Sequence, residues 1–365
     1  MQSEFFPFAD RTVVGSVAAV LFKIHQIIHV GGNQCNILGT FAGSHDTLMQ
    51  VFAVLGDESG IIMTFYEIGR IHNSTQVTDI ILDSGFLSIL LVDQGMDTVE
   101  IAIGDNLLVY PWIKKFVRVN KSFIVQRALT MRQMLESSAR MSRYMHYTIG
   151  EKKQSIWIAQ REGRAKDSND RTQDSVLKML AMGGEGDVVD RLMELNIAPL
   201  AISYEYDPCD FLKAQEFQLK RDNPAYKKTT ADDLRNMQIG LFGYKGRVHF
   251  QTAPCINDEL LQTDRSLPKQ ELFASLSALI DKRIHANYRM YPNNYVAYDL
   301  LSEDNACSGH YTEEDKQRFI AYLNQQLERI DIPGKDVPFL REKLLSMYAN
   351  PLKNYLMVTN KSVME

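Results

Sequence analysis

The sequence predicts an α/β fold: a mixed central sheet flanked by helices, with a helical C-terminal extension. Short apolar strands alternate with helical segments as far as residue 254, which is the order of a layered α/β domain. After Pro254 the apolar spacing is helical. We therefore expect a poorly legible, partly helical N-terminal segment over residues 1–70, an α/β domain over residues 71–254, and a helical extension over residues 255–365 packed on it.

The size and composition fit this fold. With 365 residues, 45% of them hydrophobic and 23% charged, the chain has the composition of a soluble globular protein that buries a sizeable core. The formal net charge of −5 gives no reason to expect nucleic acid as a partner, because affinity for phosphate backbones needs a basic excess.

The sequence lacks the motifs of several common sites. The four cysteines, Cys35, Cys209, Cys255 and Cys307, show no CxxC spacing, so we expect reduced thiols in a cytoplasmic protein. The histidines do not cluster with Asp, Glu or Cys at ligand spacing, so we expect no metal site. GxSxG and GxGxxG are both missing, which argues against a nucleophile-elbow hydrolase and a dinucleotide-binding protein.

The N-terminal segment carries few signals. Its first residues, MQSEFFPFAD, contain no basic run, which argues against a secretory signal peptide. The stretch from Val13 to Val30 is apolar but is interrupted by Lys23 and other polar residues, so it is a poor transmembrane span. It predicts an amphipathic helix that either packs on the core, the alternative we favour, or lies at a membrane surface. The periodicity from Phe41 to Tyr66 assigns no element.

The pattern becomes clearer from Asp79. Apolar spacing around Asp83 predicts a buried helix that ends before Gly95. A strand is expected at Val99–Ile103 and another in SFIVQR, with a helical turn in YPWIKKFVRVN between them. Leu129–Ile149 is the clearest helix, because methionines recur along it at helical spacing. Such a stripe is more often core, although it can also line a pocket for an acyl chain.

The stretch from Ser155 to Thr172 is the one around which the chain is organised. Ile156–Ala159 has the pattern of a short buried strand, and the chain then turns at Glu162 and Gly163. The turn carries three basic residues, which are Arg161, Arg164 and Lys166. A buried strand that delivers a carboxylate and several cations to its carboxyl end is typical of an anion site in an α/β fold. The alternative is a strand followed by a solvated charged loop.

Helices and strands alternate beyond this stretch and then give way to helices. The expected strands are Ile197–Tyr204 and Gly246–Thr252. The expected helices are Gln173–Met182, Asp210–Arg221, Asp232–Leu241, Lys269–Ile284, Thr312–Ile330 and Val337–Tyr348. The acidic first turn after Thr312 favours a helix start, because carboxylates complement the helix dipole.

Three blocks of sequence, NKSFIVQR, IWIAQREGRAKD and ISYEYDPCD, occur in this order. They resemble a bacterial branch of the glycerolipid acyltransferase family, the enzymes that acylate glycerol 3-phosphate and lysophosphatidate. The resemblance covers the chain from Asp79 to the C-terminus and is specific because several blocks occur in the right order. It implies a mixed sheet flanked by helices.

The resemblance also implies which residues bind the substrates. In the family, the active site is lined by a strand that ends in arginine, a Glu-Gly pair followed by a basic residue, and an apolar strand that carries a proline. The corresponding substrate-binding residues here are Arg127, Glu162, Gly163, Arg164, Lys166 and Pro199. The chemistry agrees, because arginines bind the oxygens of a phosphorylated acceptor bidentately.

The catalytic residues are where this sequence departs from the family. Acyl transfer from a thioester needs a general base, and a neutral histidine held by a carboxylate suits that role. In the family this histidine lies in an Asn-His-Arg turn before the helix, but residues 76–78 read QVT here. The nearest histidine is His72. Either His72 takes the missing place beside Asp79 or Asp83, or the substrate sites persist and turnover is lost or very weak, the alternative we favour.

We therefore expect an O-acyltransferase of phospholipid biosynthesis. It would move a fatty acyl chain from a thioester donor, acyl coenzyme A or acyl carrier protein, to the hydroxyl of a glycerol phosphate or lysophospholipid acceptor, with no cofactor. The alternative is a non-catalytic homologue that binds acyl lipids or acyl carriers. For either, we expect a cytoplasmic protein, with peripheral contact to the inner face of the membrane as one option.

Overall fold

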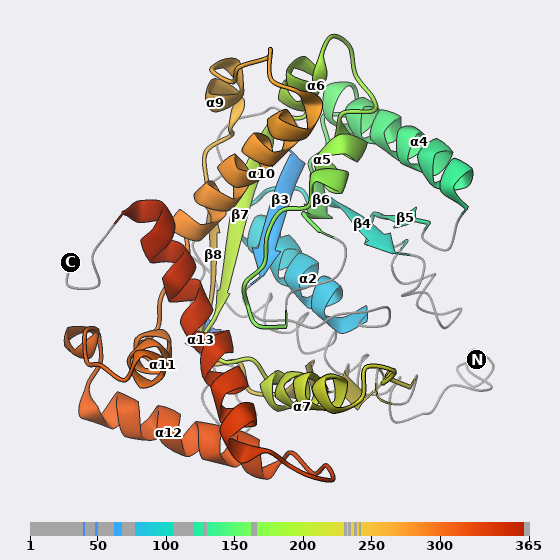
Figure 1. Ribbon diagram of the computed structural model, residues 1–365. Coiled ribbons are helices and arrows are strands. Elements are labelled where there is room, and N and C mark those ends of the chain that lie inside the picture. Colours follow the sequence, from blue (N-terminus) through green and yellow to red (C-terminus); the bar gives the residue numbers. More distant parts are fainter. Residues whose placement is uncertain are drawn as a thin grey trace, which may run out of the picture.

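The computed structural model describes residues 39–40, 48–49, 62–67, 77–104, 118, 120–126, 130–161, 166–229, 232, 235–236, 239–240 and 242–360, with side chains from Asp83 onward. It confirms the predicted fold class, a mixed sheet flanked by helices with a helical C-terminal region (Figure 1). The helix predicted at Val13–Val30 and most of the helical turn in YPWIKKFVRVN lie outside the described residues.

The central sheet contains six strands within the described residues, in the spatial order β5-β4-β6-β3-β7-β8. Their bounds are β3 (Ile62–Glu67), β4 (Glu100–Gly104), β5 (Ser122–Val125), β6 (Ile156–Ala159), β7 (Ile197–Tyr204) and β8 (Val248–Thr252). The strands from β5 to β7 are parallel, and β8 pairs antiparallel with β7 at the edge. A separate pair of two-residue strands, β1 (Gly39–Thr40) and β2 (Leu48–Met49), is antiparallel.

The two faces of the sheet belong to two hydrophobic clusters, as the alternation of side chains along β6 shows. Trp157 joins the cluster that contains Leu87 and Leu91 of α2 (Val77–Asp93). Its neighbours Ile156 and Ile158 join the other cluster. Because successive side chains of a strand point to opposite faces, α2 covers one face and the second cluster covers the other.

The second cluster is built largely from helices that follow β5. The helices that contribute to it are α4 (Met131–Gly150), α5 (Asp174–Leu180), α6 (Val188–Glu194), α9 (Asn257–Leu261) and α10 (Lys269–Ala286). Two of them begin at a capping box: Thr130 accepts a hydrogen bond from the Gln133 N–H at α4, and Asp187 accepts one from the Asp190 N–H at α6. The sheet is therefore buried on both faces, as parallel sheets usually are.

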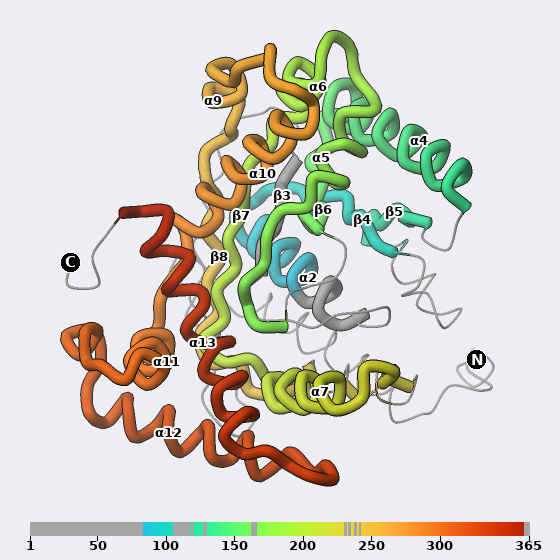
Figure 2. The backbone as a smooth tube through the Cα atoms, viewed as in Figure 1, coloured from blue at the N-terminus to red at the C-terminus, as the bar shows by residue number. Residues whose placement is uncertain are grey.

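A third cluster joins α7 (Asp210–Asp222) to the C-terminal helices. These are α11 (Pro292–Ser302), α12 (Glu313–Glu328) and α13 (Val337–Thr359), with a short 3₁₀ turn, η2 (Ser308–His310), between α11 and α12. Figure 2 shows α7, α12 and the start of α13 beyond the carboxyl end of β7, whereas α10 lies along the sheet. The helical extension thus packs both on the sheet and past its carboxyl edge.

The sequence predicted β6 and β7 with the bounds that the structure has, but it missed several elements. The largest omission is β3, which lies before residue 71 and pairs with both β6 and β7 in the middle of the sheet. The helices α6, α9 and α11 were also not predicted. The predicted end of the last helix at Tyr348 was wrong, because α13 continues through Pro351 to Thr359.

None of the described helices is both long enough and apolar enough to cross a membrane.

Candidate functional site

The connections of the sheet diverge at the carboxyl ends of β3 and β6. These strands are parallel neighbours, with Phe65 of β3 opposite Ala159 of β6. The chain leaves β3 through α2 on one face to reach β4, whereas it leaves β6 through α5 on the other face to reach β7. Such a switch point is where open α/β sheets bind ligands. The segment that carries Glu162, Gly163 and Arg164 begins here.

Most of the sequence-predicted site residues lie outside the described residues. This holds for His72, Arg127, Glu162, Gly163 and Arg164. Asp79 lies in the first turn of α2, but its side chain is outside the described part of the structure. The structure therefore describes the side chains of Asp83, Lys166 and Pro199 from that set.

Asp83 lies inside the protein, between α2 and β7. Its side chain is 1% exposed, and its Oδ1 accepts a hydrogen bond of 2.6 Å from the hydroxyl of Tyr204, the last residue of β7. The hydroxyl donor satisfies part of the demand of a buried carboxylate. Asp83 thus ties α2 to the carboxyl end of β7.

Pro199 lies in β7, level with the end of β6. It pairs with Thr64 of β3, whose partner on the other side is Ile158, the residue before the last of β6. Two strand spacings, about 10 Å, therefore separate Pro199 from Ile158 beside the switch point. Its carbonyl accepts from the N–H of Ala253 at 2.7 Å, on the β8 side. Since the N–H and C=O of one strand residue point the same way, the donor that proline lacks would face β8 and not β3, so the parallel ladder is intact.

The chain that follows the switch point is fixed by the C-terminal helices. We call residues 166–173 the anchored segment. The side-chain amide of Asn350, on α13, donates to the carbonyl of Asp167 at 2.7 Å. One turn further along the same helix, Asn354 accepts from the Arg171 guanidinium at 3.0 Å. Two residues of α13 therefore hold both halves of the segment.

Helix α10 and the base of the loop complete this anchoring. Thr172 donates twice to Oδ1 of the buried Asp281 on α10, from its N–H at 2.8 Å and from its hydroxyl at 2.6 Å. Arg161 and Asp170 form an ion pair of 2.7 Å across the base of the loop. The described residues at the two ends of this loop, Arg161 and Asp170, are therefore held by each other, and Thr172 is held by α10.

The side chain at the end of β6 has a different environment. Gln160 is 3% exposed, and neither its amide nitrogen nor its amide oxygen has a hydrogen-bond partner within the described structure. Its backbone carbonyl accepts from the Gln173 N–H at 3.1 Å, which closes the loop. A buried amide without a partner is uncommon, because it loses the hydrogen bonds that it makes with water. It therefore marks the switch point as a place where a polar ligand group would be stabilised.

Lys166 opens the anchored segment in a cluster of charges on α7. Its ammonium pairs with Oε1 of Glu216, which also accepts from Lys220 at 2.9 Å, while Oε2 of Glu216 pairs with Lys228 at 2.6 Å. We call Lys166, Lys220 and Lys228 around Glu216 the lysine cluster. The side chains of Lys166 and Lys228 are 7% and 11% exposed, whereas Lys220 is 45% exposed and opens the cluster to solvent.

Burial and the neighbouring charges change the pKa values of Lys166 and Glu216 in this cluster. Burial lowers the pKa of Lys166 to about 8, although its hydrogen bond to Glu216 opposes this, and the nearby charge of Lys220 lowers it further. Burial alone would raise the pKa of Glu216, but the charge of Lys228 and the hydrogen bonds from the lysines lower it to about 2. At neutral pH Glu216 is thus a carboxylate that holds an excess of ammonium groups.

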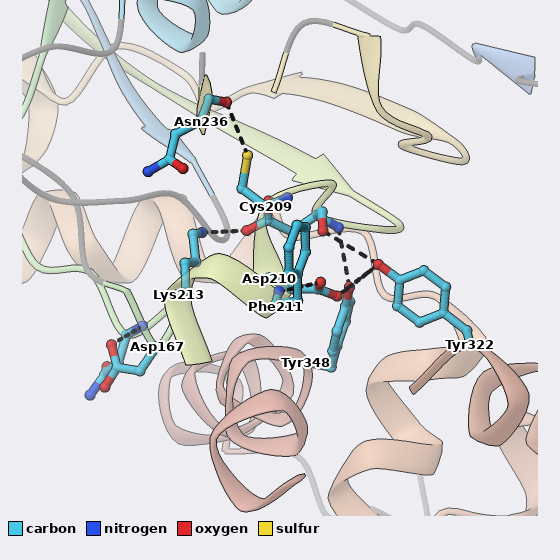
Figure 3. Close-up of polar contacts among 10 residues, drawn as sticks. Asp167, Cys209, Asp210, Phe211, Lys213, Asn236, Tyr322 and Tyr348 are labelled. Atoms are coloured by element: carbon cyan, nitrogen blue, oxygen red, sulfur yellow. Dashed lines mark hydrogen bonds and ion pairs between the residues drawn. The ribbon is translucent and has the colours of Figure 1, made fainter. Parts of the chain in front are cut away.

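A second buried polar group, the junction cluster, joins α7 to the C-terminal helices (Figure 3). It consists of Asp207, Asp210, Lys213, Tyr322 and Tyr348. Both tyrosine hydroxyls donate to Oδ2 of Asp210 at 2.7 Å, and Lys213 pairs with Asp207. Burial and the charge of Asp207 raise the pKa of Asp210 to about 7. All of these residues are buried except Tyr322, which is partly exposed, so we assign them to positioning the helices and not to contact with a ligand.

Among the described residues, no group of three or more His, Cys, Asp or Glu side chains is placed to hold a metal ion. Comparison with protein-family models, curated proteins and solved structures finds no match for this chain. The resemblance to glycerolipid acyltransferases therefore stays a prediction from the sequence blocks.

Sequence reasoning missed the residues that surround Lys166. The i,i+4 spacing of Glu216 and Lys220 on a predicted helix indicates an ion pair and was available as a signal. The third lysine, Lys228, lies beyond the helix, and Lys166 lies 50 residues before Glu216. Only the fold brings these groups together.

Proposed function

We propose that this protein is an acyltransferase of glycerolipid type, which moves an acyl chain from a thioester to the hydroxyl of a glycerol-phosphate-type acceptor. The observation that carries the proposal is where the chain enters and leaves the sequence REGR. This sequence begins at Arg161, two residues after the end of β6 at the switch point of a parallel sheet, and only Ala165 separates it from Lys166 of the lysine cluster. We call the basic residues Arg161, Arg164 and Lys166 the cationic rim. Such basic residues at this edge of the sheet suit the binding of a phosphorylated alcohol.

Chain connectivity supports His72 as the candidate base. His72 follows Glu67, the last residue of β3, by five positions, and Glu162 follows Ala159, the last residue of β6, by three. An extended residue spans about 3.3–3.6 Å, so both side chains are within reach of the same switch point. A histidine there would accept the proton of the acceptor hydroxyl as it attacks the thioester carbonyl, and the thiol of the carrier would leave.

Two observations favour the second candidate, a non-catalytic protein that binds acyl lipids or acyl carriers. The Asn-His-Arg turn of the family is missing before α2. In addition, Asp83 is buried and bonded to Tyr204, so it is not exposed to orient a base. In this version the cationic rim binds the ligand without turnover. In either version we propose a cytoplasmic protein with peripheral contact to the membrane.

The test is an acyl-transfer assay on the purified full chain. Donors would be acyl coenzyme A and acyl carrier protein, and acceptors would be glycerol 3-phosphate and a lysophospholipid. If His72 is the base, His72→Ala lowers kcat by about 10²–10⁴-fold. His45→Ala is the matched control, because it removes a histidine that is not assigned to the site.

The graft Val77→His, at the first residue of α2, separates the two candidates. An inactive wild type that gains transfer activity from the graft has kept the substrate sites and lost only the base. No transfer by the wild type or by the graft, with acyl ligands still bound, identifies the non-catalytic protein. No transfer and no binding of any donor or acceptor rejects both candidates.

A further inference from the structure

The lysine cluster holds more positive charge than its own carboxylate neutralises. Three ammonium groups share Glu216, and the other described charges near it do not change the excess, because Asp232 near Lys228 is accompanied by Arg235. The three lysines and Arg235 carry four positive charges, and Glu216 and Asp232 carry two negative charges, which leaves a net charge of +2. Two of the three lysine side chains are nearly buried, so water screens this excess poorly.

Helix packing holds the ammonium groups in place. Glu216 is 3% exposed on α7, and Lys166 belongs to the anchored segment, whose next residue, Asp167, is bonded to α13. The excess charge is therefore fixed by the fold, and Lys220 is the member of the cluster that is most exposed to solvent. A stable protein rarely keeps like charges together in a poorly screened site, unless an anion completes it.

We propose that the lysine cluster binds the phosphate group of one of the two substrates, through Lys166, Lys220 and Lys228. A phosphate dianion matches the excess of two charges, and lysines bind phosphate as point charges. The assignment to a substrate rests on the proposed function, because both the acceptor and coenzyme A carry phosphates. It extends the predicted anion site from the loop after β6 onto α7. The lowered pKa of Lys166 agrees, since a bound anion would raise it again by stabilising the ammonium form.

The test is calorimetric titration of the full chain with inorganic phosphate in a phosphate-free buffer. Lys220→Gln removes one ammonium at the exposed side and is expected to weaken phosphate binding about tenfold. Lys227→Gln is the matched control: it makes the same charge change at an exposed neighbour outside the cluster and is expected to change the Kd less than twofold. Equal weakening in both variants, or no saturable phosphate binding by the wild type, overturns the proposal.

Glu216→Gln gives a second measurement that does not depend on affinity. It removes the shared carboxylate and leaves three ammonium groups without it, so the variant should melt at a lower temperature than the wild type in phosphate-free buffer. Added phosphate should raise its Tm more than it raises the Tm of the wild type, because the anion replaces the lost charge. An equal or smaller rise in the variant contradicts an anion site.

Competition experiments identify the source of the phosphate. Displacement of inorganic phosphate by glycerol 3-phosphate assigns the cluster to the acceptor, and displacement by coenzyme A assigns it to the donor. Displacement by neither, with phosphate still bound, overturns the assignment to a substrate. If the chain transfers acyl groups but does not bind phosphate, the anion site at the lysine cluster is refuted and the proposed activity stands. If it binds phosphate esters but transfers no acyl group, the proposed activity is refuted and the anion site stands.

Discussion

At the scale of single residues, Asp210 couples stability to pH. Its pKa is about 7 in the folded protein, mainly because of burial, against 3.8 as its ordinary value. The folded state therefore binds an extra proton between these two values, and stability falls as the pH rises from about 4 to about 7. Above that range the buried carboxylate is charged in both states, and this contribution no longer changes.

We expect Asp210→Asn to flatten this dependence. The wild type should lose about 1–3 kcal/mol of unfolding free energy relative to the variant between pH 5 and pH 8. Urea unfolding at both pH values measures the difference, with Asp264→Asn as a control at an exposed loop position. Parallel pH profiles for the wild type and Asp210→Asn would show that Asp210 is already ionised at pH 5.

The Tyr204 hydroxyl makes a second prediction at this scale. Tyr204→Phe removes the donor of the 2.6 Å hydrogen bond to the buried Asp83 and should destabilise the protein by about 1–3 kcal/mol. Tyr147→Phe, on an exposed part of α4, should change stability by less than about 0.5 kcal/mol. The midpoints of urea unfolding provide the comparison. A Tyr204→Phe midpoint equal to that of the control would mean that other partners satisfy Asp83.

At the scale of elements, the anchored segment depends on α10 as much as on the strand before it. Asp281→Ala leaves the N–H and the hydroxyl of Thr172 without their shared acceptor. We expect a loss of about 2–4 kcal/mol and faster amide hydrogen exchange over residues 166–173. Lys282→Ala, at the exposed neighbouring position of α10, is the control. Unchanged exchange in Asp281→Ala would show that α13 alone holds the segment.

The sequence predicts some elements better than others for physical reasons. The bounds of β6 and β7 were found because each is a continuous apolar run buried on both faces. The strand β3 was missed because it lies in a stretch of mixed composition, and both of its partners are strands more than 80 residues away. In α11, buried polar residues such as Asn293 and Asn294 obscure the helical pattern.

Proline and capping signals explain the other differences. Helix α13 contains Pro351, which normally ends a helix because its ring removes an N–H donor and clashes with the preceding turn. Its packing against α11 and α10 favours continuation. By contrast, α6 has a capping box formed by Asp187 and Asp190, and this signal was readable in the sequence.

At the scale of the whole molecule, α10 of the C-terminal extension belongs to the same core as the sheet. Helix α10 contributes Leu272, Phe273, Leu276, Ile280 and Ile284 to the cluster on one face, and all are at most 5% exposed. Burying five such side chains contributes about 8–15 kcal/mol, which equals the entire stability of a typical domain. The α/β part therefore depends on the extension for its stability.

A fragment of residues 1–254 tests this dependence. We expect it to be insoluble or to unfold without a cooperative transition, whereas the full chain unfolds cooperatively under the same conditions. Thermal unfolding followed by circular dichroism makes the comparison. A soluble, monomeric fragment with a sharp transition would show that the sheet is stable without α10.

The candidate site could be predicted only in part, because part of it depends on contacts between residues far apart in the sequence. Sequence blocks indicated the REGR turn and its strand, because these are local features. The lysine cluster, the anchoring by α13 and the burial of Asp83 all depend on contacts between distant parts of the chain. Local patterns carry little information on such contacts, which is why they appeared only with the fold.

The bonds from α13 to the anchored segment also set an order of events during synthesis. Asn350 and Asn354 are each 183 residues beyond the partners they hold, Asp167 and Arg171. The ribosome adds about 5–20 residues per second, so the nascent loop waits roughly 10–40 seconds for these two amides. Until then the apolar side chains of α7 that pack on α13 are also exposed, and we expect chaperones to associate with the growing chain over this interval.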